Sequence, residues 1–227
     1  MSDLKPIKLY SHAAGPNPWR VVMVLKELNL PYTEEFVEFS NIKSEPYIST
    51  NPNGRVPAID DPNTNITLWE SGAILQYLVQ TYDKDHKISF PTGSKESFFA
   101  NQWLFFQASG QGPYYGQAAW FSNFHPEKLP SVIERYQKEA MRVVGVIDSH
   151  LKKHNLKYLV PDEQNPEGKP TYADIAFVPW GVNVGWLMGK DVFADGEYPA
   201  YKGWFDRVTA RAAVKEALDH KASLTKH

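Results

Sequence analysis

The chain is 227 residues long, which is enough for one large domain or two small ones. Its 24 basic and 26 acidic residues give a net charge of −2, which provides no electrostatic basis for binding nucleic acid or an anionic membrane. No apolar run is long enough to span a bilayer and residues 1–6 contain no secretory signal, so we expect a cytoplasmic protein. The absence of cysteine excludes disulfides, thiolate metal sites and a cysteine nucleophile. Any thiol in its chemistry must therefore come from a ligand.

The first elements alternate between strand and helix. Residues 7–10 predict a short strand, and apolar side chains recur at helical spacing over residues 19–30. Asn17 followed by Pro18 is typical of a helix start, with asparagine as the N-cap and proline in the first helical position. Residues 32–39 place aromatic and β-branched side chains at alternating positions, which predicts a second strand. Because a helix joins the two strands, they should run parallel.

The next segment completes a small sheet. Residues 41–53 are polar and irregular, with room for one or two helical turns. Strands are predicted over residues 56–59 and 66–69, and the short turn between them indicates an antiparallel hairpin. A helix should then open at Glu70-Ser71 and run to about residue 82.

The rest of the chain has a helical pattern. Glycine and proline separate predicted helices over residues 97–124, 130–154, 172–188 and 201–218. We therefore expect an α/β domain over residues 1–86, a linker over residues 87–96 and an all-α domain over residues 97–227.

Pro57 stands at the head of a predicted strand, where it cannot donate to the hydrogen-bond ladder. A cis peptide bond after Val56 would turn the backbone N–H and C=O groups before the proline outward, where they could pair with an extended peptide ligand. A trans proline at an edge strand fits the local sequence as well, and trans is the common form.

Glu70 and Ser71 lie at a predicted helix start, where unpaired N–H groups and the helix dipole favour an anion. A ligand carboxylate could bind the N–H and hydroxyl of Ser71, and Glu70 could pair with an ammonium group beside it. The two residues would then hold an α-amino acid head group. An ordinary helix cap made by these side chains is the alternative.

Asn17 offers a different chemistry at the first helix. Its side-chain amide could donate to a thiolate, and a helix N-terminus lowers the pKa of a nearby thiol. The N-cap role predicted above would use the carbonyl oxygen of Asn17, so the two roles are compatible.

Three further motifs carry no expected chemistry. His150 and His154 are one helical turn apart, but no third ligand is evident, so we expect a solvated helix face and no metal site. The Gly110-Gln111-Gly112 segment lacks the preceding strand of a dinucleotide-binding motif. Thr171-Tyr172-Ala173-Asp174 is a capping box, which is a folding feature.

The order of N-terminal elements, with Val56-Pro57 before a strand and Glu70-Ser71 opening the next helix, resembles the thioredoxin-like domain of glutathione transferases. The capping box resembles the one in the helical domain of that superfamily. Within it, the chain is most similar to the fungal transferases related to the yeast nitrogen-catabolite regulator. Residues 15–17, 51–58, 69–75, 103–107 and 173–180 carry this likeness.

The resemblance implies the glutathione transferase fold, an α/β thioredoxin-like domain followed by an all-α domain, with glutathione as cofactor and a homodimer as the assembly. It places Asn17 near the glutathione thiol. It pairs the backbone of Val56, next to a cis Pro57, with the cysteinyl unit. Glu70 and Ser71 would bind the γ-glutamyl head group.

Two cations complete the implied site. Lys43, or a neighbour in the irregular loop, would meet the glycyl carboxylate, and Arg55 would be a further contact. The chain departs from related bacterial enzymes at Gly15, where they have a threonine. Activation of the thiol therefore rests more on Asn17 and on the helix end, with Ser11 and Tyr10 as alternative donors that the spacing does not single out.

The function implied by the resemblance is transfer of glutathione to electrophilic or disulfide substrates, in detoxification or the stress response. A glutathione-dependent disulfide reductase and a non-enzymatic regulator or ligand-binding protein on the same fold are the alternatives. The electrophile is expected between the domains, beside aromatic residues such as Trp103, Phe106, Tyr114, Tyr115 and Trp120.

Overall fold

The computed structural model describes residues 4–225, which form two compact units. The first unit contains the chain up to Ser89 and again from Ala210 onward, and the second unit is Phe90–Thr209. Each unit has its own core. Within residues 4–225, no helix combines the length and the apolar character that crossing a membrane requires.

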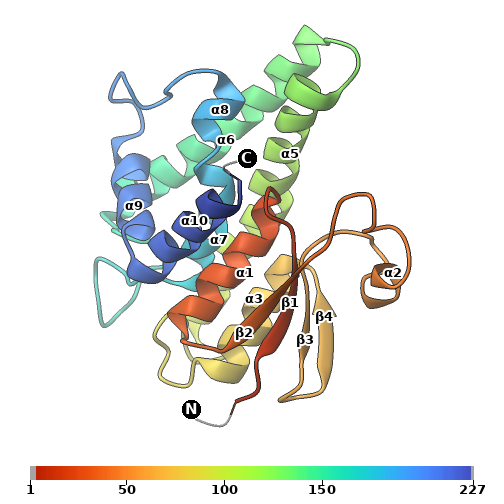
Figure 1. Cartoon of the computed structure of the whole chain (residues 1–227). Coiled ribbons are helices and arrows are strands. Elements are labelled where there is room, and N and C mark those ends of the chain that lie inside the picture. The colour runs from red at the N-terminus through yellow and green to blue at the C-terminus, as the bar shows by residue number, and fades with distance from the viewer. Residues whose placement is uncertain (1–3, 226–227) are drawn as a thin grey trace. The chain divides into compact units, whose positions relative to one another are not determined.

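The first unit is a four-stranded sheet with helices packed against it (Figure 1). Its elements up to Ser89 are β1 (Ile7–Ser11), α1 (Pro16–Glu27), β2 (Tyr32–Phe36), α2 (Tyr47–Thr50), β3 (Ala58–Asp61), β4 (Ile66–Trp69) and α3 (Ser71–Tyr82). The strand order is β2-β1-β3-β4. β1 and β2 run parallel and the β3–β4 hairpin is antiparallel, so both predictions are confirmed. The α/β thioredoxin-like class of this unit is confirmed with them.

Two element boundaries differ from the prediction at prolines. α1 begins at Pro16, with Gly15 extended at the N-cap, so the prediction of Asn17 as N-cap is wrong. Pro16 suits the first helical position because its φ is already helical, and Pro18 is tolerated because the first-turn N–H groups lack intrahelical partners. β3 begins at Ala58 because Pro57 has no N–H for the ladder.

The C-terminal helix α10 (Ala212–Leu224) belongs to the first unit, although the sequence placed it in an all-α domain ending at residue 227. The predicted helix over residues 201–218 is in fact two helices, α9 (Pro199–Thr209) and α10. The chain breaks between them because Arg211 is extended and pairs through its guanidinium with the carboxylate of Glu27 in α1.

The regular elements of the second unit are all helices. Its elements are α4 (Lys95–Phe106), the π-helical η1 (Gln107–Gln111), α5 (Gly112–Ala119), the π-helical η2 (Trp120–Phe124), α6 (Pro130–His154), α7 (Tyr172–Gly181), α8 (Val184–Met188) and α9. The predicted bounds of α6 are confirmed. The stretch predicted over residues 172–188 is interrupted between α7 and α8, just after Pro179, which removes a donor inside α7.

Asp174 is the polar centre of the second unit. It is fully buried, and its carboxylate accepts bonds from the backbone N–H of Leu159 at 2.9 Å and the indole N–H of Trp204 at 2.8 Å. The N–H and hydroxyl of Thr171 donate to its other oxygen at 2.8 and 2.7 Å, which confirms the predicted capping box. One side chain thus joins the start of α7 to α9 and to the loop after α6.

Replacing Asp174 with alanine would leave these buried donors without an acceptor. We expect the free energy of unfolding to fall by at least about 3 kcal/mol, because each unpaired buried donor costs about 1–3 kcal/mol. Urea denaturation followed by circular dichroism measures this. Asp195→Ala, in an exposed loop, is the control and should stay within about 0.5 kcal/mol of the parent protein. Equal stability of the two variants would contradict the role of Asp174 as the buried acceptor that joins these segments.

Candidate functional site

The register of the sheet gathers several loops at one of its ends. Ala58, the first residue of β3, pairs with Tyr10 in β1 and with Trp69 at the end of β4. Ser11 and Phe36, which end β1 and β2, pair with each other. The segments that adjoin these strand ends carry the predicted site residues, which are Asn17, Lys43, Arg55, Val56, Pro57, Glu70 and Ser71.

The start of α3 has an unusual backbone conformation. Glu70 is its N-cap and has φ +71°, a conformation that is costly for a residue with a Cβ and persists where the surroundings impose it. Ser71 is buried, and its hydroxyl accepts a hydrogen bond from Nη1 of Arg20 at 3.4 Å. The helix start therefore combines a carboxylate, a hydroxyl and a buried cation.

Arg20 is a candidate site residue that the sequence analysis did not find. It lies on α1, is only 2% exposed, and joins α1 to the start of α3. Burial lowers the pKa of its guanidinium to about 9, and the carboxylate of Glu70 opposes that shift. Arg20 therefore remains charged at neutral pH. Arg20 could have been found from the sequence as a basic residue within the apolar run of a predicted helix.

A tight turn leads into Val56-Pro57, and Asn51 organises it. The buried side chain of Asn51 donates through Nδ2 to the carbonyl of Arg55 at 2.5 Å and accepts from the backbone N–H of Asn53 at 2.9 Å. The hydroxyl of Tyr47 donates to the same Arg55 carbonyl at 2.6 Å. Sequence reasoning noted this segment as part of the resemblance but missed the role of Asn51.

The Val56-Pro57 peptide bond is cis, in agreement with the resemblance. The side chain of Val56 is half-buried and packs with Ile42 against a small apolar cluster. That cluster consists of Tyr10, Val37, Tyr47 and Ala58. The loop after β2 and the turn before β3 are thereby held together.

Gly54 fixes the position of Lys43 relative to this turn. Gly54 has φ +60°, and a Cβ there would lie 2.9 Å from the carbonyl oxygen of Ile42 and 3.1 Å from Cγ of Lys43. The close approach therefore requires glycine. Lys43 and Arg55 are both exposed beside it, so two cations flank the turn.

Asn17 is the second residue of α1, where the backbone N–H groups have no intrahelical acceptor. The loop before it is ordered by local bonds. The backbone N–H of Ala14 donates to Nδ1 of His12 at 3.1 Å, and the indole N–H of Trp19 donates to the carbonyl of Ala13 at 3.0 Å. Asn17 is half-buried and lies in the first turn of α1, which these bonds hold in place.

Two of the aromatic residues expected beside a ligand are instead part of the core. Tyr115 is fully buried and its hydroxyl donates to the carbonyl of Ala140 at 3.2 Å. Trp103 is 5% exposed, with its ring 4.6 Å from that of His150. This contact also contradicts the expectation of a solvated face at His150. Helical periodicity cannot distinguish an aromatic residue in a core from one in a binding site.

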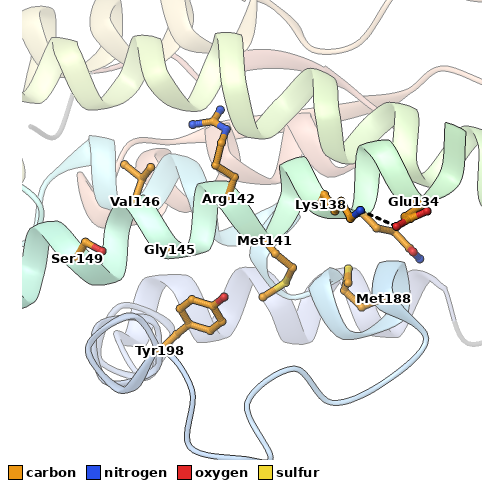
Figure 2. Close-up of a pocket in the computed structure, with 10 residues that line it drawn as sticks. Glu134, Lys138, Met141, Arg142, Gly145, Val146, Ser149, Met188 and Tyr198 are labelled. Carbon is orange, nitrogen blue, oxygen red and sulfur yellow. Dashed lines mark ion pairs between the residues drawn. The ribbon is translucent and has the colours of Figure 1, made fainter. Parts of the chain in front are cut away.

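A cavity of about 830 Å³ lies in the second unit, on one face of α6. Figure 2 shows Met141, Met188 and Tyr198 projecting into it, with the ion pair of Glu134 and Lys138 at one end. None of the predicted site residues lines it.

Comparison with known proteins agrees with the geometry. Residues 5–80 match the family model of the N-terminal domain of glutathione S-transferases, and residues 130–207 match a model of their C-terminal domain. The glutathione S-transferase-like protein tpcF of Aspergillus fumigatus is 50% identical over 222 residues, which are 96% of this chain and 97% of that protein. The URE2 protein of Candida albicans is 36% identical over 239 residues, covering 92% of this chain and 69% of that protein.

A solved structure gives the same result. The glutathione transferase URE2P6 of Phanerochaete chrysosporium, in complex with oxidized glutathione, has a TM-score of 0.90 and 45% identity, and the match covers 99% of this chain and 100% of that one. A thioredoxin-like unit joined to a helical unit defines the class of two-domain transferases. The chain belongs to the glutathione S-transferase family, and its resemblance to the fungal Ure2-type members is confirmed.

Proposed function

We propose that the chain is a glutathione transferase that activates the glutathione thiol for attack on electrophilic or disulfide substrates. The observation that carries the proposal is the convergence of the α1 start, the loop after β2, the cis Val56-Pro57 turn and the α3 start at one end of the sheet. Family membership and the glutathione-bound Ure2-type structure support it.

The chemistry of the residues fits the polar groups of glutathione. The γ-glutamyl head group carries a carboxylate and an ammonium, which match the Ser71 hydroxyl at the α3 start and the Glu70 carboxylate. The peptide backbone matches that of Val56. The glycyl carboxylate matches the cations Lys43 and Arg55, which flank the neighbouring turn.

Glutathione supplies the thiol that this chain lacks. In the proposed mechanism, the side-chain amide of Asn17 donates to the sulfur, and the first-turn N–H groups of α1 add a favourable potential. Lowering a thiol pKa by one unit requires about 1.4 kcal/mol, and one hydrogen bond to a charged group supplies about 1.5–3 kcal/mol. Asn17 and the helix end are therefore sufficient to hold a thiolate near neutral pH.

Asn17→Ala should raise the pKa of the bound thiol by about one unit and reduce turnover below that pKa about tenfold. The measurement is the pH profile of aryl halide conjugation and, separately, of the reduction of a small disulfide. Gln80→Ala, exposed on α3, is the control. An unshifted profile with full turnover in the Asn17 variant would show that another group activates the thiol.

The same assays separate the alternative functions. Turnover of the disulfide alone would favour the glutathione-dependent reductase. Glutathione binding without turnover of any tested electrophile would favour a regulator or ligand-binding protein.

Ser71→Ala should weaken glutathione binding about tenfold, since a hydrogen bond to a charged group of this strength corresponds to about 1.4 kcal/mol. Turnover at saturating glutathione should change less than twofold, because the head group is remote from the reacting sulfur. Isothermal titration calorimetry and steady-state kinetics measure the two effects. Thr33→Ser, exposed on β2, is the control and should bind glutathione like the parent protein. Equal glutathione affinities of Ser71→Ala and Thr33→Ser would show that Ser71 is not part of the site.

We also propose that the chain forms a homodimer. On α4, Phe98 and Phe105 are 63% and 64% exposed and lie two helical turns apart, so one face of this helix presents apolar surface to solvent. Sedimentation velocity should give twice the mass of one chain, and Phe105→Glu should shift the protein toward the monomer. A parent protein that sediments as a monomer at micromolar concentration would contradict this.

A further inference from the structure

The C-terminal helix α10 runs antiparallel to α1 within the first unit. Its start contacts the end of α1, since Arg211 pairs with Glu27. In its middle, Glu216 pairs with Lys26 at 3.3 Å. Near its end, the His220 ring meets the Trp19 ring in the first turns of α1. Figure 1 shows the two helices side by side.

The end of α10 nearest Arg211 is firmly anchored. Nε and Nη2 of Arg211 donate to the two carboxylate oxygens of Glu27 at 2.6 and 2.7 Å, and the Glu27 side chain is only 4% exposed. Lys87 donates to the backbone carbonyl of Glu27 at 2.6 Å. Such a bidentate, largely buried pair fixes both direction and register, and removing one partner would leave a buried charge. This pair therefore fixes the register of α10 against α1.

The other end of α10 reaches the loop before α1. The ring of His220 lies edge-on to the fully buried ring of Trp19, with centroids 5.3 Å apart. Trp19 in turn donates its indole N–H to the carbonyl of Ala13 at 3.0 Å. Nδ1 of His220 is also 3.5 Å from Oε2 of Glu34 in β2. A chain of contacts thus runs from α10 through Trp19 to the loop that precedes Asn17.

We propose that α10 is a positioning element for the thiol site, in which His220 holds Trp19 and Trp19 holds the loop over residues 13–15 and the first turn of α1. The inference rests on the proposed function, in which Asn17 and that turn stabilise the thiolate. His220 and Trp19 act through the loop and are positioning residues. Their effect is on the geometry of a hydrogen bond, whose strength falls steeply as its angle departs from linear.

A merely structural role for α10 gives a different expectation. In that case His220 would affect the stability of the first unit, and the thiol of bound glutathione would keep its pKa. A positioning role changes the thiol pKa while leaving glutathione affinity nearly constant, because the head-group contacts at Ser71 and Glu70 are not involved. The two accounts are separated by these two measurements on the same protein.

The experiment titrates the thiol of glutathione bound at saturation, using the ultraviolet absorbance of the thiolate, in the full chain. His220→Ala should raise the apparent thiol pKa by about half a unit, which is about threefold less thiolate below that pKa, with the glutathione Kd within about twofold. His220→Phe keeps a ring against Trp19 and should restore the parent pKa. Glu216→Ala, which breaks the exposed pair with Lys26, is the matched control and should not shift it.

Two outcomes would overturn the inference. One is a parent-like thiol pKa in His220→Ala, and the other is an equal shift in His220→Ala and His220→Phe, which would assign the effect to the contact with Glu34. If His220→Ala does not fold, Trp19→Phe takes its place. Phenylalanine retains most of the packing of Trp19 but loses the indole N–H that donates to the carbonyl of Ala13. A parent-like thiol pKa in Trp19→Phe would overturn the inference as well.

Measurements on the parent protein test the proposed function independently of the variants. If the parent protein binds no glutathione, or if the bound thiol has the same pKa as free glutathione, the transferase proposal fails and the inference fails with it. If the parent protein lowers the thiol pKa and the variants do not change it, only the role of α10 is refuted.

Discussion

β3 pairs with β1 on one side and with β4 on the other, and these two pairings position the loops at one end of the sheet. Ala58 stands opposite Tyr10 and Trp69, so the turn before β3, the loop after β1 and the start of α3 share one end of the sheet. A slip of one residue would turn every β3 side chain to the opposite face and remove the fully buried Ile59 from its packing. Because burial of this face fixes the register, the stability of the core and the assembly of the site have the same cause.

Buried charged groups then join segments that are distant along the chain. Arg20 links α1 to the start of α3, Arg211 links α10 to Glu27, and Asp174 links α7 to α9. Asp174 accepts four hydrogen bonds, and the ion pair of Arg211 with Glu27 is bidentate. Loss of one partner from a buried ion pair costs about 3–5 kcal/mol. Apolar burial supplies most of the free energy of folding, whereas these polar links decide which helix lies beside which. In the first unit the pair of Arg211 with Glu27 also connects α10 to the helix that carries Asn17.

The absence of cysteine determines what chemistry this site can perform. In the proposed mechanism, Asn17 and the first turn of α1 stabilise a thiolate but cannot supply one. The sulfur therefore belongs to the ligand in every proposed reaction, whether the second substrate is an electrophile or a disulfide. In this proposal the protein contributes the electrostatic environment, and that environment depends on how accurately the start of α1 is held.

Elements that depend on local signals could be predicted from the sequence. The bounds of β4 and α6, the parallel and antiparallel pairs and the capping box at Thr171 follow from periodicity, proline, glycine and loop length. The positions of Asn17, Val56 and Glu70 at element ends, and so most of the candidate site, were also predictable. Three features became apparent only in the folded chain: Arg20 contacts Ser71, Tyr115 lies in the core, and α10 belongs to the first unit. The physical reason is that a local pattern reports which face of an element is apolar, whereas the segment that covers this face is set by contacts between residues far apart in the chain.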